Sequence, residues 1–190
     1  MADFQKAYRI TVLGNEGGYD PGTNEKETYR GVDRGANPHW KGWVIIDNLK
    51  KSNPGITTVQ INTRLAANAE FQADIQSFYK ANYWDTVKLD QVNDQQIADN
   101  LFDCSVNQGD GIARHFMQLA CNNVRIAVGS AMQALTLDGI IGLKTLTMLN
   151  SLSAPKLMEN INELREERYE NSRGYDIWGK IWLARLVKYV

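Results

Sequence analysis

Hydrophobic residues recur at helical spacing along most of this chain. Phe4, Tyr8 and Val12 form the first such run, and Glu16 continues it by one more turn. The stretch 19–34 is instead rich in glycine, asparagine and charge, and its Thr-Tyr pair favours a small hairpin or irregular lobe. Further helical periodicity covers residues 43–49, 71–84, 97–108, 113–124, 146–149, 157–168 and 178–186.

This pattern predicts a mainly α-helical protein with one minor β element and a helical C-terminal part. Trp40 and Trp43 flank a glycine in a predicted loop, where they either plug the core or form a wall on which sugars stack. Trp178 and Trp182 recur at helical spacing with Ile181 and Leu186, so we expect them to dock the last helix on the core.

The most informative position is Glu16, a carboxylate that continues an apolar stripe at the end of a helix. Two glycines follow it and are suited to terminating the helix. Partial burial of a carboxylate raises its pKa, as a general acid near neutral pH requires. The following loop offers a second carboxylate from Asp20, Glu25 or Glu27, and a hydroxyl from Thr28 that is able to hold a water molecule. A helix-end glutamate turned into solvent is the simpler alternative.

Composition bounds the class of protein. The chain has 190 residues with 43% hydrophobic residues, enough for a sizeable core, and a net charge of −1 argues against a nucleic-acid partner. No apolar run is long enough to span a membrane, and the first residues lack a signal-peptide pattern. We therefore expect synthesis in the cytoplasm.

Cysteine and histidine give no sign of a metal or disulfide framework. Cys104 and Cys121 lie in apolar helical patterns and are expected to be buried free thiols. His39 and His115 have no neighbouring ligands, so neither a metal site nor a cofactor is expected.

Four motifs occur in an order that resembles glycoside hydrolase family 108, the lysozyme-like N-acetylmuramidases of the secretion activator type. The resemblance spans nearly the whole chain. The motifs are Glu16-Gly-Gly-Tyr19 with Thr28-Tyr-Arg-Gly-Val32, Tyr79-Lys-Ala-Asn-Tyr-Trp84, Phe102-Asp-Cys-Ser-Val-Asn-Gln-Gly109, and Asp138-Gly-Ile-Ile-Gly-Leu-Lys-Thr145. The last is similar to the signature of small helical peptidoglycan-binding modules.

The resemblance implies a lysozyme-like catalytic region over 1–110, with a helical peptidoglycan-binding-like region over 111–190 docked on it. It implies that Glu16 is the catalytic acid. The loop after Tyr19 is shorter than the family's usual run, which places Glu25 nearer the usual position of the second carboxylate and leaves Asp20 as the alternative. Thr28 then holds water, and the candidate substrate-binding residues are Tyr19, Tyr29, Trp84, Asp103, Asn107 and Gln108.

The expected activity is hydrolysis of the β-1,4 bond between N-acetylmuramic acid and N-acetylglucosamine in peptidoglycan, in a single inverting step. A lytic transglycosylase and a non-catalytic wall-binding secretion accessory protein are the alternatives. We expect a monomer that acts on the cell wall in the periplasm after release by a holin or a secretion system.

Overall fold

The computed structural model describes residues 1–22 and 26–189 and confirms a mainly α-helical fold with one small antiparallel sheet. The chain divides into two compact units, which we call the hairpin unit (Tyr8–Asn82) and the bundle unit (Met1–Ala7 with Tyr83–Val190). Helix α1 (Phe4–Tyr8) and the π-helix η2 (Lys80–Trp84) contain the two boundaries. The boundary predicted at residue 110 does not coincide with either of them.

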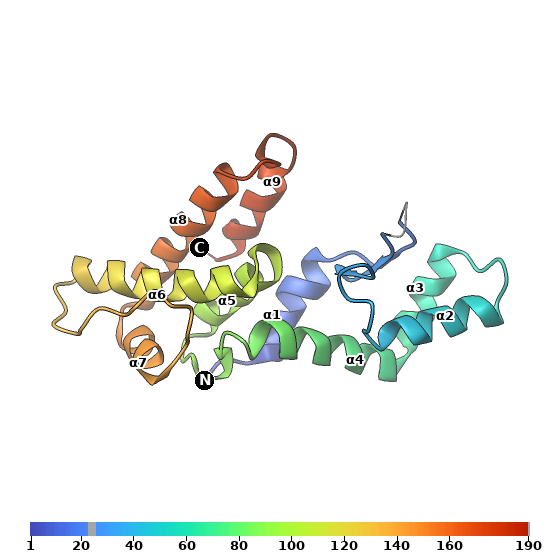
Figure 1. Ribbon diagram of the computed structural model, residues 1–190, viewed down its shortest axis with the longest axis horizontal. Helices are drawn as coiled ribbons and strands as arrows, with labels where there is room; N and C mark the ends of the chain where they lie inside the picture. Colours follow the sequence, from blue (N-terminus) through green and yellow to red (C-terminus); the bar gives the residue numbers. More distant parts are fainter. Residues whose placement is uncertain (23–25, 190) are drawn as a thin grey trace. The chain divides into compact units, whose positions relative to one another are not determined.

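The hairpin unit combines the small sheet with several helices (Figure 1). The chain enters through a π-helix, η1 (Arg9–Leu13), in which each turn holds one residue more than an α-turn. The remaining elements are β1 (Tyr19–Asp20), β2 (Thr28–Tyr29), β3 (Val32–Asp33), α2 (Gly42–Ser52), α3 (Thr58–Ala67) and α4 (Ala69–Tyr79).

Aromatic residues fill the core of the hairpin unit. Trp40 and Trp43 are buried and meet edge to face with ring centroids 5.0 Å apart, and Trp40 also packs on Phe71. The indole N–H of Trp43 donates to the carbonyl of Asn37 at 2.8 Å, which satisfies its polar atom. Of the two roles considered for this pair, the structure therefore shows the core plug.

The helix starts in this unit are specified locally. Thr57 and Gln60 form a reciprocal capping box at the start of α3. The side chain of Asn68 accepts from the backbone N–H of Phe71 at the start of α4. These caps fix where α3 and α4 begin. Asn62 on α3 and Tyr79 on α4 then donate hydrogen bonds to the backbone of the hairpin region.

The bundle unit is built around α5 (Gln95–Gln108), which packs against α6 (Asp110–Ala127) and α8 (Ala154–Glu170) (Figure 1). Helices α6 and α8, which follow residue 110, thus pack on α5 within this unit. The other elements are η3 (Leu89–Gln91), α7 (Leu143–Ser151), α9 (Tyr175–Leu186) and η4 (Val187–Tyr189).

A buried charge cluster joins three helices of the bundle. Asp103 on α5 is fully buried and pairs with Arg165 on α8 and with Arg185 on α9, the latter at 2.8 Å. Tyr169 donates its hydroxyl to Asn107 at 2.7 Å beside the cluster. Ions buried in this way are stable only as a set, because each guanidinium has lost its water.

Helix α9 only partly follows the prediction that its apolar stripe is buried. Leu186 is buried and Trp182 stacks on Tyr169 with centroids 5.5 Å apart. Trp178 and Ile181, however, are 52% and 59% exposed. Helical spacing identified the stripe but not its width, because one contact face is enough to hold a helix on its neighbour.

The two cysteines are free and buried, as predicted, and burial raises the pKa of each thiol to about 12. Among the described residues, no helix is long and apolar enough to cross a membrane. No group of side chains within residues 1–22 and 26–189 is arranged to hold a metal ion.

Candidate active site on the hairpin unit

Glu16 lies at the end of the first helical segment, where its backbone N–H donates to the carbonyl of Val12 at 3.0 Å. Glu16 is half-buried. The chain beyond it is fixed from α3, because Asn62 accepts from the N–H of Tyr19 at 2.6 Å and donates to its carbonyl at 3.3 Å. The carboxylate therefore stands on backbone that is anchored on both sides.

The turn of the hairpin faces Glu16. Arg30 and Gly31 join β2 to β3 with φ of 51° and 80°, and two successive left-handed residues are the requirement of a type I′ turn. The hydroxyl of Tyr79 on α4 donates to the carbonyl of Arg30, and Arg30 Nη1 donates to the carbonyl of Glu16 at 3.4 Å. A strained turn held by hydrogen bonds is typical of functional sites.

The Glu16 carboxylate is seated directly against Gly31. A Cβ atom added at Gly31 would lie 2.6 Å from Glu16 Oε2 and 3.2 Å from the hydroxyl of Tyr79. Only glycine leaves room for the carboxylate in this position. The structure thus brings Glu16, the hairpin turn and Tyr79 together, and it does so through contacts that are far apart in the sequence.

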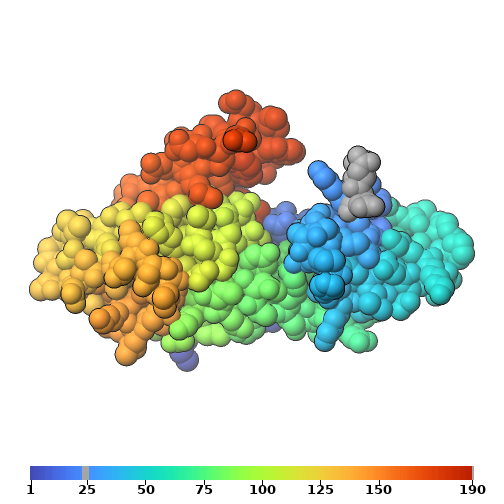
Figure 2. All heavy atoms as spheres, viewed as in Figure 1, coloured from blue at the N-terminus to red at the C-terminus, as the bar shows by residue number. Residues whose placement is uncertain are grey.

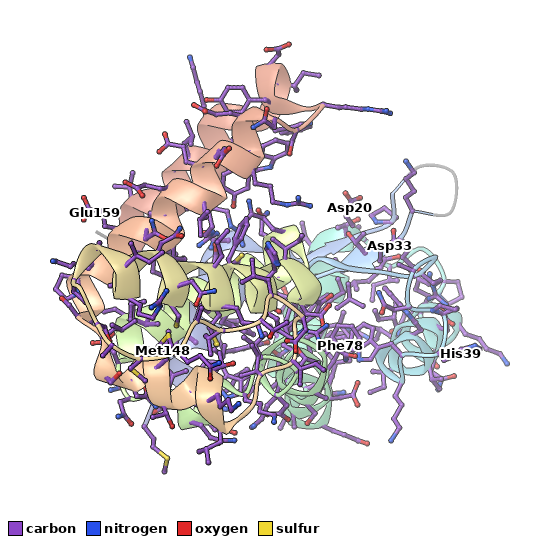
Figure 3. All side chains as sticks on the ribbon, turned by 60° about the vertical axis from the view of Figure 1, so that its left-hand side comes forward. Asp20, Asp33, His39, Phe78, Met148 and Glu159 are labelled. Carbon is purple, nitrogen blue, oxygen red and sulfur yellow. The ribbon has the colours of Figure 1, made fainter. Side chains whose placement is uncertain are left out.

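Thr28 stands between two acids in the sheet. The register pairs Thr28 with Asp20 on β1 and with Asp33 on β3, and directly opposed residues share one face of a sheet. Figure 3 labels both acids at this sheet. The Oδ1 atom of Asp20 accepts from the N–H of Gly22 at 2.9 Å, and that of Asp33 from the N–H of Ala36 at 2.8 Å.

Sequence reasoning did not identify Asp33 as a candidate carboxylate. The signal was present, because a two-residue turn at Arg30-Gly31 pairs Thr28 with the residue five positions later. Glu25, the preferred second carboxylate, lies outside the described residues, so its position stays a prediction.

Glu27 is tied into a network that holds the hairpin to α2. Its carboxylate accepts from the hydroxyl of Tyr19 at 2.6 Å and from Lys50 at 2.8 Å, and it pairs with Arg34. Burial acts to raise the pKa of Glu27, but the hydrogen bonds and charges of these partners outweigh it, so the pKa lies below its ordinary value. This group is held as an anion and has no proton to give near neutral pH.

The same network lines a shallow pocket of about 460 Å³, bordered by Tyr19, Glu27, Arg34 and Lys50. Burial, followed by the hydrogen bond to Glu27, raises the pKa of Tyr19, so its phenol stays neutral. Tyr19 borders this pocket but is only 5% exposed, so its contact with substrate stays a prediction.

Tyr29 and Trp84 have no exposed face for a sugar. Tyr29 packs edge to face on Phe71 at 4.8 Å, and its hydroxyl accepts from Gln72 at 3.0 Å. Trp84 is fully buried in the bundle unit and packs on Phe4. Both candidates therefore serve the packing of their units in this structure. The sequence did not reveal this, because an aromatic residue in a motif gives no sign of whether its ring is buried or exposed.

The three polar candidates on α5 have partners within the bundle unit. Asp103 belongs to the buried charge cluster. Asn107 accepts from Tyr169, and Gln108 donates to the carbonyl of Arg165 at 3.1 Å. Asp103 thus has a structural role, and contact of Asn107 or Gln108 with substrate stays a prediction.

Comparison with known proteins identifies the family of this chain. The family model described as Glycosyl hydrolase 108 matches residues 10–109, which include the helix end, the hairpin and all of α5. The solved structure of Brucella abortus SagA matches with a TM-score of 0.63 and 19% identity, over 98% of this chain and 90% of that chain, which shows likeness of fold. A search of curated proteins finds no match. Because the family model covers more than half of its length, the chain belongs to the glycosyl hydrolase 108 family.

Proposed function

We propose that this protein is a peptidoglycan N-acetylmuramidase that hydrolyses the β-1,4 bond between N-acetylmuramic acid and N-acetylglucosamine. The observation that carries the proposal is the Glu16 carboxylate seated against Gly31 beside Tyr79. Glycoside hydrolases work with a positioned carboxylic acid that protonates the leaving oxygen of the glycosidic bond. Glu16 is the acid that the hairpin, α3 and α4 combine to position.

The second carboxylate activates or orients water on the opposite face of the sugar. Glu25 is the proposed residue, with Asp20 as the alternative, and Thr28 is proposed to hold the water. The row of Asp20, Thr28 and Asp33 across the sheet supports this part, because it puts the hydroxyl between two acids. Inversion is the proposed outcome, and NMR of the fresh product anomer would test it.

The test of Glu16 compares the parent with Glu16→Gln on purified peptidoglycan. General acid catalysis supplies about 10²–10⁴-fold, so we expect a rate loss in that range with unchanged thermal unfolding. Glu70→Gln is the matched control, because Glu70 is an exposed glutamate on α4 in the same unit. Wall-clearing activity of Glu16→Gln within a few-fold of the parent would remove Glu16 from the mechanism.

The second carboxylate is tested by three amide variants. Glu25→Gln is expected to lose much of the rate, whereas Asp20→Asn and Asp33→Asn are expected to perturb mainly the turns that they cap. A larger rate loss in Asp20→Asn than in Glu25→Gln would transfer the role to Asp20.

The chemistry of the product separates hydrolysis from the alternatives. Mass spectrometry of the fragments is expected to show a muramic acid with a free reducing end. An anhydro-muramic product would identify a lytic transglycosylase, and intact glycan strands would identify a wall-binding protein without this activity. The proposed place of action is the cell wall, after release of the protein by a holin or a secretion system.

A further inference from the structure

The bundle unit contains a pocket that shares no lining residue with the candidate active site. It has a volume of about 720 Å³, which is within the range of ligand-binding pockets. The connection between α6 and α7, residues 128–142, forms one wall and α7 forms another. This segment lies at the surface of the unit, coloured yellow to orange in Figure 2.

The wall is a built structure, because a row of side chains on α6 holds its backbone. The row consists of Arg114, Gln118, Asn122 and Arg125, which the helical spacing places on one face. Each of the four hydrogen-bonds to the connecting segment, and Gln118 is buried. Their backbone partners are Gly139, Ile140, Leu135 and Met132.

Asn122 gives the segment a strand-like edge. Its side-chain amide accepts from the N–H of Leu135 at 2.8 Å and donates to the carbonyl of Leu135 at 2.9 Å. When both groups of one residue point to the same side, its backbone is extended, and the groups of its neighbours point to the other side. The backbone groups of Ala134 and Thr136 therefore face away from α6.

This outer edge is open. Ala134 and Thr136 are exposed and line the pocket, and their backbone groups have no hydrogen-bond partner in the part of the chain that the structure describes. An extended peptide pairs with such an edge through its own amides. The lining residues include no aromatic side chain, whereas sugar sites commonly stack rings on aromatic faces.

Opposite charges stand at the same pocket. Asp138 Oδ1 accepts from Gln118 at 2.8 Å and from the N–H of Ile140 at 2.9 Å, which lowers the pKa of Asp138. Lys144 is exposed in the first turn of α7, where the helix dipole disfavours a cation. Stabilisation of α7 therefore does not account for a lysine at this position. Ile140 and Leu143, 70% and 82% exposed, add apolar surface to the lining.

We propose that this pocket binds a short extended peptide that carries both an amino group and a carboxylate. The ladder groups of Ala134 and Thr136 pair with its amides, Asp138 faces the amino group and Lys144 the carboxylate. The identity of the peptide rests on the proposed function, which makes it the stem peptide of peptidoglycan. The bundle unit would then hold the wall by its peptide while the hairpin unit cleaves the glycan.

The experiment is calorimetric titration of the full chain with a synthetic stem tetrapeptide and, separately, with N-acetylglucosamine tetramer. We expect saturable binding of the tetrapeptide alone. Ala134→Pro removes an N–H from the open edge, and it should weaken binding about three- to tenfold, as should Lys144→Gln. Leu137→Pro is the matched control, because its N–H belongs to the edge that faces α6 and Leu137 does not line the pocket, and it should bind like the parent.

Three results would overturn the inference: no binding of the tetrapeptide, binding of the sugar tetramer alone, or tetrapeptide binding that Ala134→Pro and Lys144→Gln leave unchanged. Thermal unfolding of each variant shows whether it is folded. If a proline variant does not fold, the binding affinity of Lys144→Gln still tests the inference. Cleavage of peptidoglycan without peptide binding refutes this inference alone. Peptide binding without Glu16-dependent cleavage refutes the proposed function alone.

Discussion

A single methyl group at Gly31 should strongly lower activity without replacing a proposed catalytic residue. Alanine at this position places Cβ 2.6 Å from Glu16 Oε2 and 3.1 Å from its Cδ. Ordinary contacts of a Cβ atom begin at 3.4 Å, so Glu16 Oε2 must retreat by about 0.8 Å (3.4 − 2.6 Å). Misplacement on that scale costs a catalytic step about 10²-fold, and we expect this loss in Gly31→Ala.

We expect the loss of stability in Gly31→Ala to be small even though its loss of activity is large. Gly31 has φ of 80°, where a side chain costs about 1–2 kcal/mol, or roughly 2–8 °C in Tm for a chain of this size. Gly55 has φ of 82°, and a Cβ there meets nothing within 4 Å. Gly55→Ala therefore carries the same backbone cost in the same unit without the contact to Glu16.

The assay measures release of reducing ends from purified peptidoglycan, together with thermal unfolding. We expect the two alanine variants to unfold at similar temperatures, because the atom that the new Cβ meets most closely is at the end of a flexible side chain, and we expect only Gly31→Ala to lose its rate. Equal activity of the two variants would show that catalysis does not need Glu16 where the hairpin turn holds it.

Two further predictions concern buried charges. Glu27→Gln should lower the free energy of unfolding by about 1–3 kcal/mol at neutral pH. The pKa of Glu27 is lowered in the folded state, so the stability that its carboxylate contributes is present above its ordinary pKa and is lost as pH falls through the folded pKa. Denaturant titrations of the parent and the variant should therefore give converging free energies of unfolding at that low pH. A difference that stays constant down to low pH would contradict this. Asp103→Asn leaves Arg165 and Arg185 buried without their anion and should cost about 3–5 kcal/mol, measured by urea unfolding, whereas an effect on substrate affinity with unchanged stability would restore its binding role.

The sequence predicted the helices and the hairpin because both rest on local patterns. Apolar periodicity identifies α4, α5, α6 and α8, and the Thr28-Tyr29 pair identifies a strand. Helix α3 was not predicted, although its capping box of Thr57 and Gln60 is a local signal that was there to be found.

The candidate site was predictable only where its parts are local. Glu16 and its glycines are neighbours in the chain, so the pattern indicated them. Asn62 and Tyr79 come from helices that lie 43 and 49 residues beyond the backbone groups they hold, and no local spacing reveals such contacts. Asp103 was likewise a candidate for substrate binding, whereas two arginines more than 60 residues away pair with it in the core.

The π-helix before Glu16 takes up one residue without turning the segment that follows. Each residue of an α-helix turns the chain by about 100°, and a π-turn contains one residue more than an α-turn. The wider turn at Arg9–Leu13 therefore works as a one-residue insertion that leaves the residues before and after it in nearly the register of a continuous α-helix. Deleting one residue from this turn, for instance the exposed Ile10, would restore a continuous α-helix with the Glu16 carboxylate still directed toward Gly31. Deleting a residue between Leu13 and Glu16 would instead turn the Glu16 side chain by about 100°. The spacing between the π-turn and Glu16 is thus a constraint that no substitution at Glu16 itself would reveal.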